Sequence, residues 1–106
     1  MTDKVNLIKW DQSIDGPLTD TNMRKKLKSK GYTSTMYVFT PGTDFPNHTH
    51  SMTKLDAITS GKFLLSMHGQ DVIMEPGDIV EVPKNVVHNA HVIGSEDVTF
   101  FDSVKI

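Results

Sequence analysis

Two stretches decide the fold of this chain: PGTDFPNHTHSMTKLDAITSG, residues 41–61, and PGDIVEVPKNVVH, residues 76–88. The first contains His48-Thr49-His50, and the second ends on His88. On a β-strand, side chains two positions apart point to the same face, so the imidazoles of His48 and His50 can converge on one ion. Imidazole is a suitable ligand for Zn, Cu, Fe and Ni. Two exposed histidines on the protein surface would, however, give the same HxH pattern. The tripeptide alone therefore leaves a metal site and an exposed histidine pair equally open.

The sequence around these stretches predicts short strands separated by turns. Segments rich in β-branched and aromatic residues alternate with clusters of Gly, Pro and Asp, the pattern of an all-β sandwich or barrel. The expected strands cover residues 5–10, 33–40, 55–60, 62–67, 72–74, 79–82, 86–93 and 98–104. Residues 22–30 are ambiguous, because Met23 and Leu27 are their only apolar residues. They fit a short basic helix, and at least as well a polar edge strand protected by its lysines.

Composition narrows the chemistry that this chain can perform. With 106 residues it has the length of a single domain, and its formal net charge of −2 gives no reason to expect a nucleic acid or membrane partner. The absence of cysteine excludes disulfides, thiolate metal sites and a thiol nucleophile, so a transition metal would have to bind through histidines and carboxylates. No apolar stretch has the length of a signal peptide or membrane span, and we expect a cytoplasmic protein.

The order and spacing of the two stretches resemble the two motifs of the cupin superfamily. In the first, Gly42 precedes HxH by five residues and Gly61 follows after ten more; in the second, a PGD turn is followed by Pro83 and His88. The resemblance implies a double-stranded β-helix, an RmlC-like jelly-roll barrel. It implies one divalent transition metal per chain (Zn, Ni, Fe, Mn or Cu) on His48, His50 and His88. We expect residues 33–106 to form the barrel, residues 1–32 to be a strand and loop extension packed on it, and the protein to be a homodimer.

The sequence departs from the cupin pattern at Lys54, which stands where the family has its acidic ligand. A lysine ammonium repels a divalent cation and is costly to bury unpaired. Three arrangements are open: Lys54 pairs with Asp56 beside a three-histidine site; Asp56 becomes the fourth ligand after a β-bulge; or the site binds no metal. Lys54 and Asp56 are also candidate catalytic residues, the lysine as a donor or general base and Asp56 as a proton relay.

The remaining residues carry weaker expectations. His91 should face away from His88, and His68 should be exposed in a hairpin turn. The phenylalanines and Trp10 are expected in the core or in a subunit contact, and Met52 on a pocket wall. Of Phe100 and Phe101, one ring should point outward to a covered surface such as a dimer interface.

Two function classes fit this sequence. The first is a metal-dependent enzyme, of the dioxygenase, isomerase or lyase type, that acts on a small organic molecule inside the barrel. The second is a non-catalytic ligand-binding or sensory module. The missing acid favours the second class, whereas the open coordination positions of a three-histidine site favour the first.

Overall fold

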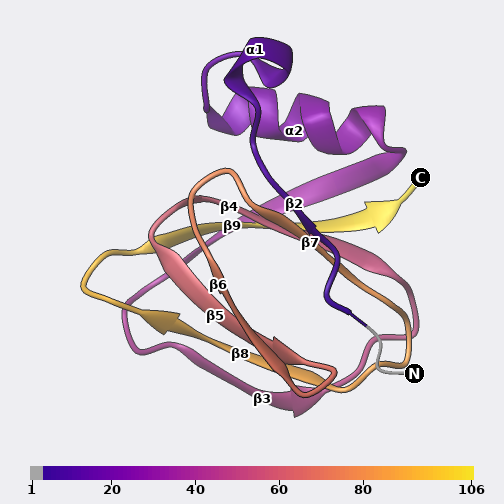
Figure 1. The fold of residues 1–106 in the computed structure, drawn as a ribbon, viewed down its shortest axis with the longest axis vertical. Coiled ribbons are helices and arrows are strands. Elements are labelled where there is room, and N and C mark those ends of the chain that lie inside the picture. Colours follow the sequence, from indigo (N-terminus) through magenta and orange to yellow (C-terminus); the bar gives the residue numbers. More distant parts are fainter. Residues whose placement is uncertain (1–3) are drawn as a thin grey trace.

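Nine strands form two antiparallel sheets that pack face to face, in the computed structural model that describes residues 4–106 (Figure 1). This arrangement confirms the predicted all-β jelly roll. The five-stranded sheet has the order β1 (Leu7–Ile8), β7 (Ile79–Val82), β4 (Lys54–Ser60), β9 (Val98–Lys105) and β2 (Tyr32–Phe39). The four-stranded sheet has the order β3 (Asp44–His48), β8 (His88–Ile93), β5 (Lys62–Met67) and β6 (Gln70–Met74). β3, which contains Pro46, is the strand that the sequence analysis did not anticipate.

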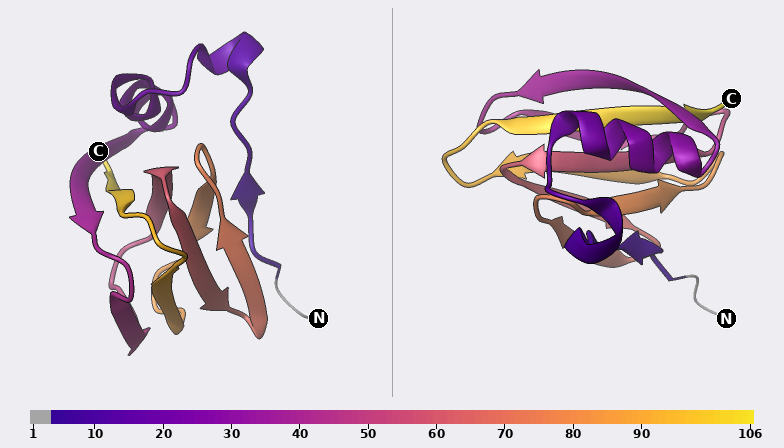
Figure 2. Two further views of the ribbon diagram at one scale, coloured as in Figure 1. Left: turned by 90° about the vertical axis from the view of Figure 1, so that its left-hand side faces the viewer. Right: turned by 90° about the horizontal axis from the view of Figure 1, so that it is seen from above.

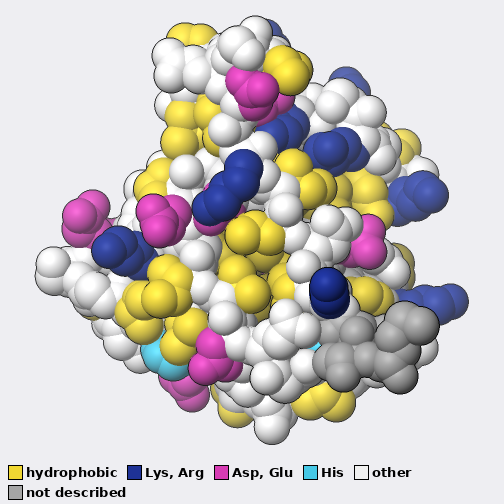
Figure 3. All heavy atoms as spheres, viewed as in Figure 1, with side chains coloured by type: hydrophobic (Ala, Val, Ile, Leu, Met, Phe, Trp, Pro, Cys, Tyr) yellow, Lys and Arg dark blue, Asp and Glu magenta, His cyan; other side chains and the backbone are white. Residues whose placement is uncertain are grey.

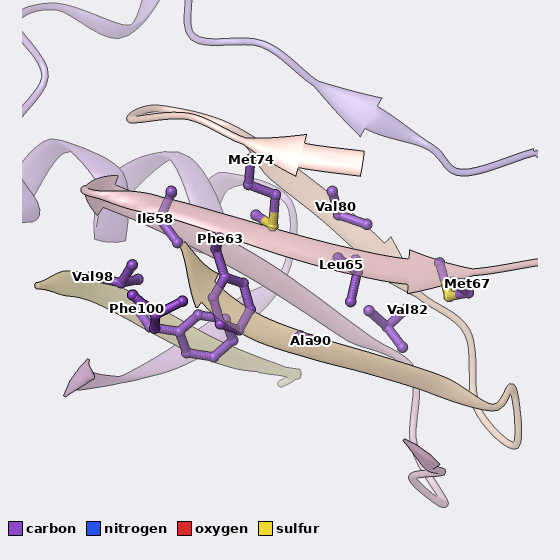
Figure 4. Packing of buried hydrophobic residues seen from close by; sticks show 11 residues of the cluster. Ile58, Phe63, Leu65, Met67, Met74, Val80, Val82, Ala90, Val98 and Phe100 are labelled. Carbon is purple, nitrogen blue, oxygen red and sulfur yellow. The ribbon is translucent and has the colours of Figure 1, made fainter. Parts of the chain in front are cut away.

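The main core lies between the two sheets and follows strand alternation. Phe63, Leu65 and Met67 of β5 point inward, and apolar residues at alternate positions of the facing strands β7 and β9 pack against them (Figure 4). The rings of Phe63 and Phe100 lie 5.3 Å apart across the space between the sheets. Because one face of each strand is buried here, strand register is fixed, and so is the direction of each polar side chain within a strand.

A second, smaller core lies on the outer face of the five-stranded sheet, beneath the helix α2 (Asp20–Ser29) (Figure 2). The polar edge strand considered for residues 22–30 is therefore wrong. Thr19 caps the helix, since its hydroxyl accepts a hydrogen bond from the Asn22 amide at 3.0 Å. Two apolar side chains suffice to hold it because both Met23 and Leu27 are fully buried against the sheet. A single turn of helix, α1 (Gln12–Asp15), precedes it.

Phe101 belongs to this second core and confirms that one of the two rings points outward to a covered surface, although the cover is α2 of the same chain and not a second subunit. Its ring points outward from the barrel and is completely buried, because α2 of the same chain covers it. The guanidinium of Arg24 lies 5.4 Å from the centre of the Phe101 ring. The opposite face of α2 is basic, and lysine and arginine side chains gather around the helix on the molecular surface (Figure 3).

Two glycines in the motif stretches are required by close packing. Gly77, in the PGD turn, has a φ of +96°, and a Cβ there would lie 2.6 Å from the Cβ of Trp10. Gly61, between β4 and β5, has a φ of +78°, and its Cβ would lie 2.5 Å from the Asp97 carbonyl oxygen. Only glycine adopts such conformations readily in so little space. In residues 4–106, no helix is long and apolar enough to cross a membrane.

Candidate metal centre and its cavity

Three histidines converge in the space between the sheets. His48 is the last residue of β3, His50 follows two residues later, and His88 is the first residue of β8, directly paired with His48. One ring nitrogen from each lies within 4.8 Å of the others. The ring centres of His48 and His88 are 4.1 Å apart, and that of His50 lies 4.9 Å and 5.0 Å from them. The two motif stretches are therefore brought together as the sequence suggested.

The backbone fixes which nitrogen two of these rings present. Nδ1 of His48 lies 2.7 Å from the Pro46 carbonyl oxygen, and Nδ1 of His88 lies 3.0 Å from that of Val86. A carbonyl oxygen can only accept, so both Nδ1 atoms carry the hydrogen, and both Nε2 atoms keep a free lone pair. This is the arrangement that orients metal-binding imidazoles in proteins. The donor set therefore fits a transition-metal ion.

The surroundings of the histidine rings also favour the neutral form that a metal needs. Burial lowers the pKa of His88, although its hydrogen bond to Val86 opposes this shift. The pKa of His50 is lowered by burial and then by the positive charge of Lys54. A neutral imidazole offers its lone pair without first releasing a proton.

The histidines open onto a cavity of about 270 Å³ between the two sheets. Its remaining lining is mostly aromatic and aliphatic: Tyr37, Phe39, Phe45, Phe63, Leu65, Ala90 and Phe100, with the two acids Asp56 and Asp102. Phe39 contacts Phe45 and Phe100 at ring-centre distances of 4.8 Å and 5.2 Å. The phenylalanines thus belong to the core, as expected, but four of them also form the cavity wall. A mainly apolar cavity with a few converging polar groups is typical of small-molecule sites.

Lys54 has a different partner from the one expected. Its ammonium lies 3.0 Å from Oδ2 of Asp102, on the neighbouring strand β9, and does not form an ion pair with Asp56. β4 pairs with β7 in continuous register from Lys54 to Ala57, so no bulge reorients Asp56. Asp56 lines the cavity and lies outside the group of three histidines.

Asp102 is the functional candidate that the sequence analysis missed. The sequence held only part of the signal: Asp102 is two residues from Phe100 and shares its inward face of β9, but the residue opposite it is set by strand pairing. The directly opposite residue on β4 is Asp56, which is 8% exposed. Burial, and then the charge of Asp102, raises the pKa of Asp56 to about 7, whereas Lys54 acts in the other direction.

The other candidates lie outside the histidine group. His91 is on β8 opposite Leu64 and Asp44, facing away from His88 as expected. His68 is in the predicted hairpin turn between β5 and β6 but is partly buried there. Met52 is not on a pocket wall, since it is 54% exposed in the bend between β3 and β4. Strand alternation would point Met52 inward together with His48 and His50, but the strand β3 ends at His48 and does not reach Met52.

A family model described as the cupin domain matches residues 35–104, about two thirds of the sequence. The chain belongs to the cupin family. Both motif stretches and all three histidines of the group lie within the matched residues. No curated protein matches the chain.

Solved structures share the cupin fold with this chain at low sequence identity. An RmlC-like cupin from Methanocaldococcus jannaschii is 25% identical over 70% of this chain and 69% of its own, with a TM-score of 0.63. KdgF from Halomonas sp. is 17% identical over 72% and 70%, with a TM-score of 0.62. A structure described with the DMSP lyases RdDddP and RnDddQII is 22% identical over 71% of this chain and 38% of that chain, with a TM-score of 0.63.

Proposed function

We propose that this cupin binds one divalent transition metal ion through His48, His50 and His88 and uses it in a reaction on a small organic molecule. The observation that supports this most is the orientation of the rings, in which two Nε2 lone pairs are free because their Nδ1 atoms donate to the backbone. The adjoining cavity of about 270 Å³ is large enough for a small ligand beside the ion. Zn, Ni, Fe, Mn and Cu all suit imidazole ligands.

Different residues of the cavity have different roles in such a reaction. A divalent ion on three imidazoles supplies Lewis-acid polarisation of a ligand oxygen. The aromatic wall holds the apolar part of the ligand and excludes water. The carboxyl oxygen of Asp56 exchanges a proton with the ligand. Lys54 maintains the charge balance of the acids through Asp102. The proposed chemistry is of the dioxygenase, isomerase or lyase type, and one solved structure of similar fold is described as a DMSP lyase.

A second function, a non-catalytic ligand-binding or sensory module, is favoured by one observation. Lys54 occupies the position of the cupin motif at which an acidic ligand is expected, and it is committed to Asp102. A cavity with an ion but without turnover would still bind the same class of small molecule. Steady occupancy of the cavity by a small molecule that the metal-loaded protein never converts would favour the module.

Metal binding itself tests the proposal. Protein purified without an affinity tag should contain close to one transition-metal ion per chain by elemental analysis. His48→Ala and His88→Ala should each abolish binding in calorimetric titration, because each removes one imidazole of the group. His91→Ala is the matched control, since it removes a histidine from the outward side of β8 and should bind as the wild type does. Failure to bind any of these metals after reconstitution would overturn the proposal.

We also propose that the protein is a homodimer and that residues 1–32, of which residues 1–3 lie outside the described part of the chain, act as an extension of the barrel formed by residues 33–106. The extension is supported by the second core, in which α2 covers the outer face of the five-stranded sheet. The dimer is supported by β2, an edge strand with three exposed apolar side chains: Met36, Tyr37 and Val38.

A further inference from the structure

Two carboxyl groups lie side by side within the cavity, on neighbouring strands of the five-stranded sheet. Asp56 of β4 is directly opposite Asp102 of β9 in the antiparallel register, and both side chains line the cavity. Directly opposed residues have their Cβ atoms about 4.5–5.5 Å apart, a distance at which two carboxyl groups on the same face can meet. Two ionised carboxylates this close, in an apolar cavity, repel each other strongly.

One carboxyl oxygen of Asp102 accepts a hydrogen bond and the other lacks a donor within residues 4–106. Its Oδ2 accepts from the ammonium of Lys54 at 3.0 Å. Its Oδ1 is buried and has no hydrogen-bond partner among the described residues. A buried acceptor without a donor is costly, so a donor is expected nearby. The directly opposed side chain is the 8% exposed Asp56, which becomes a donor when it is protonated.

We propose that Asp56 and Asp102 share one proton and form an acid pair, in which Asp102, held by Lys54, is the acceptor and Asp56 is the proton-bearing donor of the cavity. The Asp56 hydroxyl donates to the free Oδ1 of Asp102 when the cavity holds no ligand. Asp102 is then a positioning residue, and Lys54 acts through it. The raised pKa of Asp56 agrees with this arrangement, because burial and the charge of Asp102 are its two largest causes.

The other neighbours of Asp56 do not offer an alternative partner for the proton. On its second side, β7 places the apolar Val80 opposite Asp56. The outer face of the sheet is covered by α2 and is apolar beneath it. The remaining titratable groups that line the cavity are the three histidines and Tyr37, and none of them is on β7 or β9, the two strands paired with β4 on either side of Asp56. The carboxyl of Asp102 is thus the acceptor that the sheet register aligns with Asp56.

The acid pair indicates the class of ligand. A protonated carboxyl group donates a hydrogen bond to a carbonyl oxygen, and the aromatic wall suits an apolar body, so a small aromatic or aliphatic carbonyl compound fits both. If a proton is transferred, it leaves the Asp56 oxygen for the ligand oxygen, and Asp56 becomes a carboxylate. This use of the proton rests on the proposed function, whereas the acid pair itself exists in the metal-free protein.

Carbon-13 NMR of the metal-free protein with labelled aspartate carboxyls tests the pair directly. One carboxyl signal should titrate near pH 7, and it should be missing in Asp56→Asn. In Asp102→Asn its midpoint should fall by about one pH unit or more, because the neighbouring charge is removed and Lys54 is released. Asp97→Asn, an exposed aspartate, is the matched control and should leave the midpoint unchanged. A wild type without an aspartate titrating above about pH 6, or a midpoint unmoved in Asp102→Asn, would overturn the proposal.

Acetophenone, a small aromatic ketone, tests the donor role and keeps the proposal falsifiable if Asp102→Asn does not fold. Its affinity for the wild type should fall severalfold as pH rises through about 7, where Asp56 loses its proton. Asp56→Asn keeps a hydrogen-bond donor at every pH, so its affinity for acetophenone should depend little on pH. Because this variant retains all three histidines, the comparison separates the effect of Asp56 from theirs. Absence of ketone binding at any pH, or equal pH dependence in the two proteins, would overturn the ligand assignment. Metal titration of the same variants should match the wild type, so a failure of the metal proposal is seen separately.

Discussion

Single residues determine the chemistry of the cavity, and Lys54 and Asp56 give it a different set of polar groups from the one that the cupin motif predicts. Lys54 stands at the position of an acidic metal ligand, yet its ammonium is 3.0 Å from Asp102 and so balances an acid. Asp56, across the ladder from Asp102, is left buried without that cation. The lysine is therefore part of a polar cluster in which both carboxyl groups lie on the five-stranded sheet, outside the group of three histidines.

The buried carboxyl of Asp56 should make stability depend on pH. Its pKa is about 7 in the folded protein and 3.8 in the unfolded chain, so the folded state binds the proton more tightly. The stability from this proton is complete below about pH 4, is lost as pH rises through about 7, and amounts to about 4 kcal/mol. Asp56→Asn, which cannot ionise, should unfold at higher urea concentration than the wild type at pH 8 but not at pH 4.

The exposed aspartate variant Asp97→Asn serves as the control and should follow the wild type at both pH values. An Asp56→Asn protein no more stable than the wild type at pH 8 would contradict a buried carboxyl with a raised pKa. The measurement is equilibrium urea unfolding, in which a change of midpoint at constant slope reports stability.

The histidines could be predicted from sequence, and Asp102 could not, for a physical reason. Spacing within one stretch shows that His48 and His50 can converge, and the second motif supplies His88. Asp102 is the single acid of β9, and its role depends on which residue the neighbouring strand places opposite it. That pairing is a tertiary property, set by register between β4 and β9, and a single sequence does not contain it.

At the scale of elements, α2 is a helix that two apolar side chains hold in place, because they pack against an apolar face of the five-stranded sheet. Sequence alone left residues 22–30 between a helix and an edge strand, because two apolar residues make a narrow stripe. The Thr19 cap was the local signal for a helix, and the apolar outer face of β4 and β9 supplied the rest. Such a face is visible only when the inward and outward positions of those strands are known.

Leu27→Ala should therefore destabilise the protein by about 2–5 kcal/mol, the usual cost of such a truncation at a fully buried position. Thermal unfolding measures this loss. Lys28→Ala, at the next and exposed position of α2, is the matched control and should change stability by less than about 0.5 kcal/mol. Metal affinity of the folded Leu27→Ala protein should be unchanged, because the histidines lie on the other side of the sheet. Equal stability of the two variants would show that α2 contributes little to the fold.

For the whole molecule, the four sheet edges differ in how they are protected. β1 is two residues long, β3 contains Asp44 and Pro46, and β6 contains Asp71. β2 is eight residues long and has no charged side chain. Lysines, prolines and short length are the usual protections of an edge strand against pairing with another chain. β2 lacks all three, and it also contributes Tyr37 and Phe39 to the cavity wall.

An uncharged antiparallel edge is complementary to a second copy of itself, so β2 is where we expect two chains to pair. Val38, 57% exposed on β2, should lie within that interface. Val38→Lys places two ammonium groups in it and should shift the protein from dimer to monomer, measured as molar mass by light scattering during gel filtration. Ile73→Lys is the matched control and should stay dimeric, because Ile73 is 51% exposed on β6, an edge strand of the four-stranded sheet. A monomeric wild type, or a dimer disrupted by Ile73→Lys and not by Val38→Lys, would contradict pairing through β2.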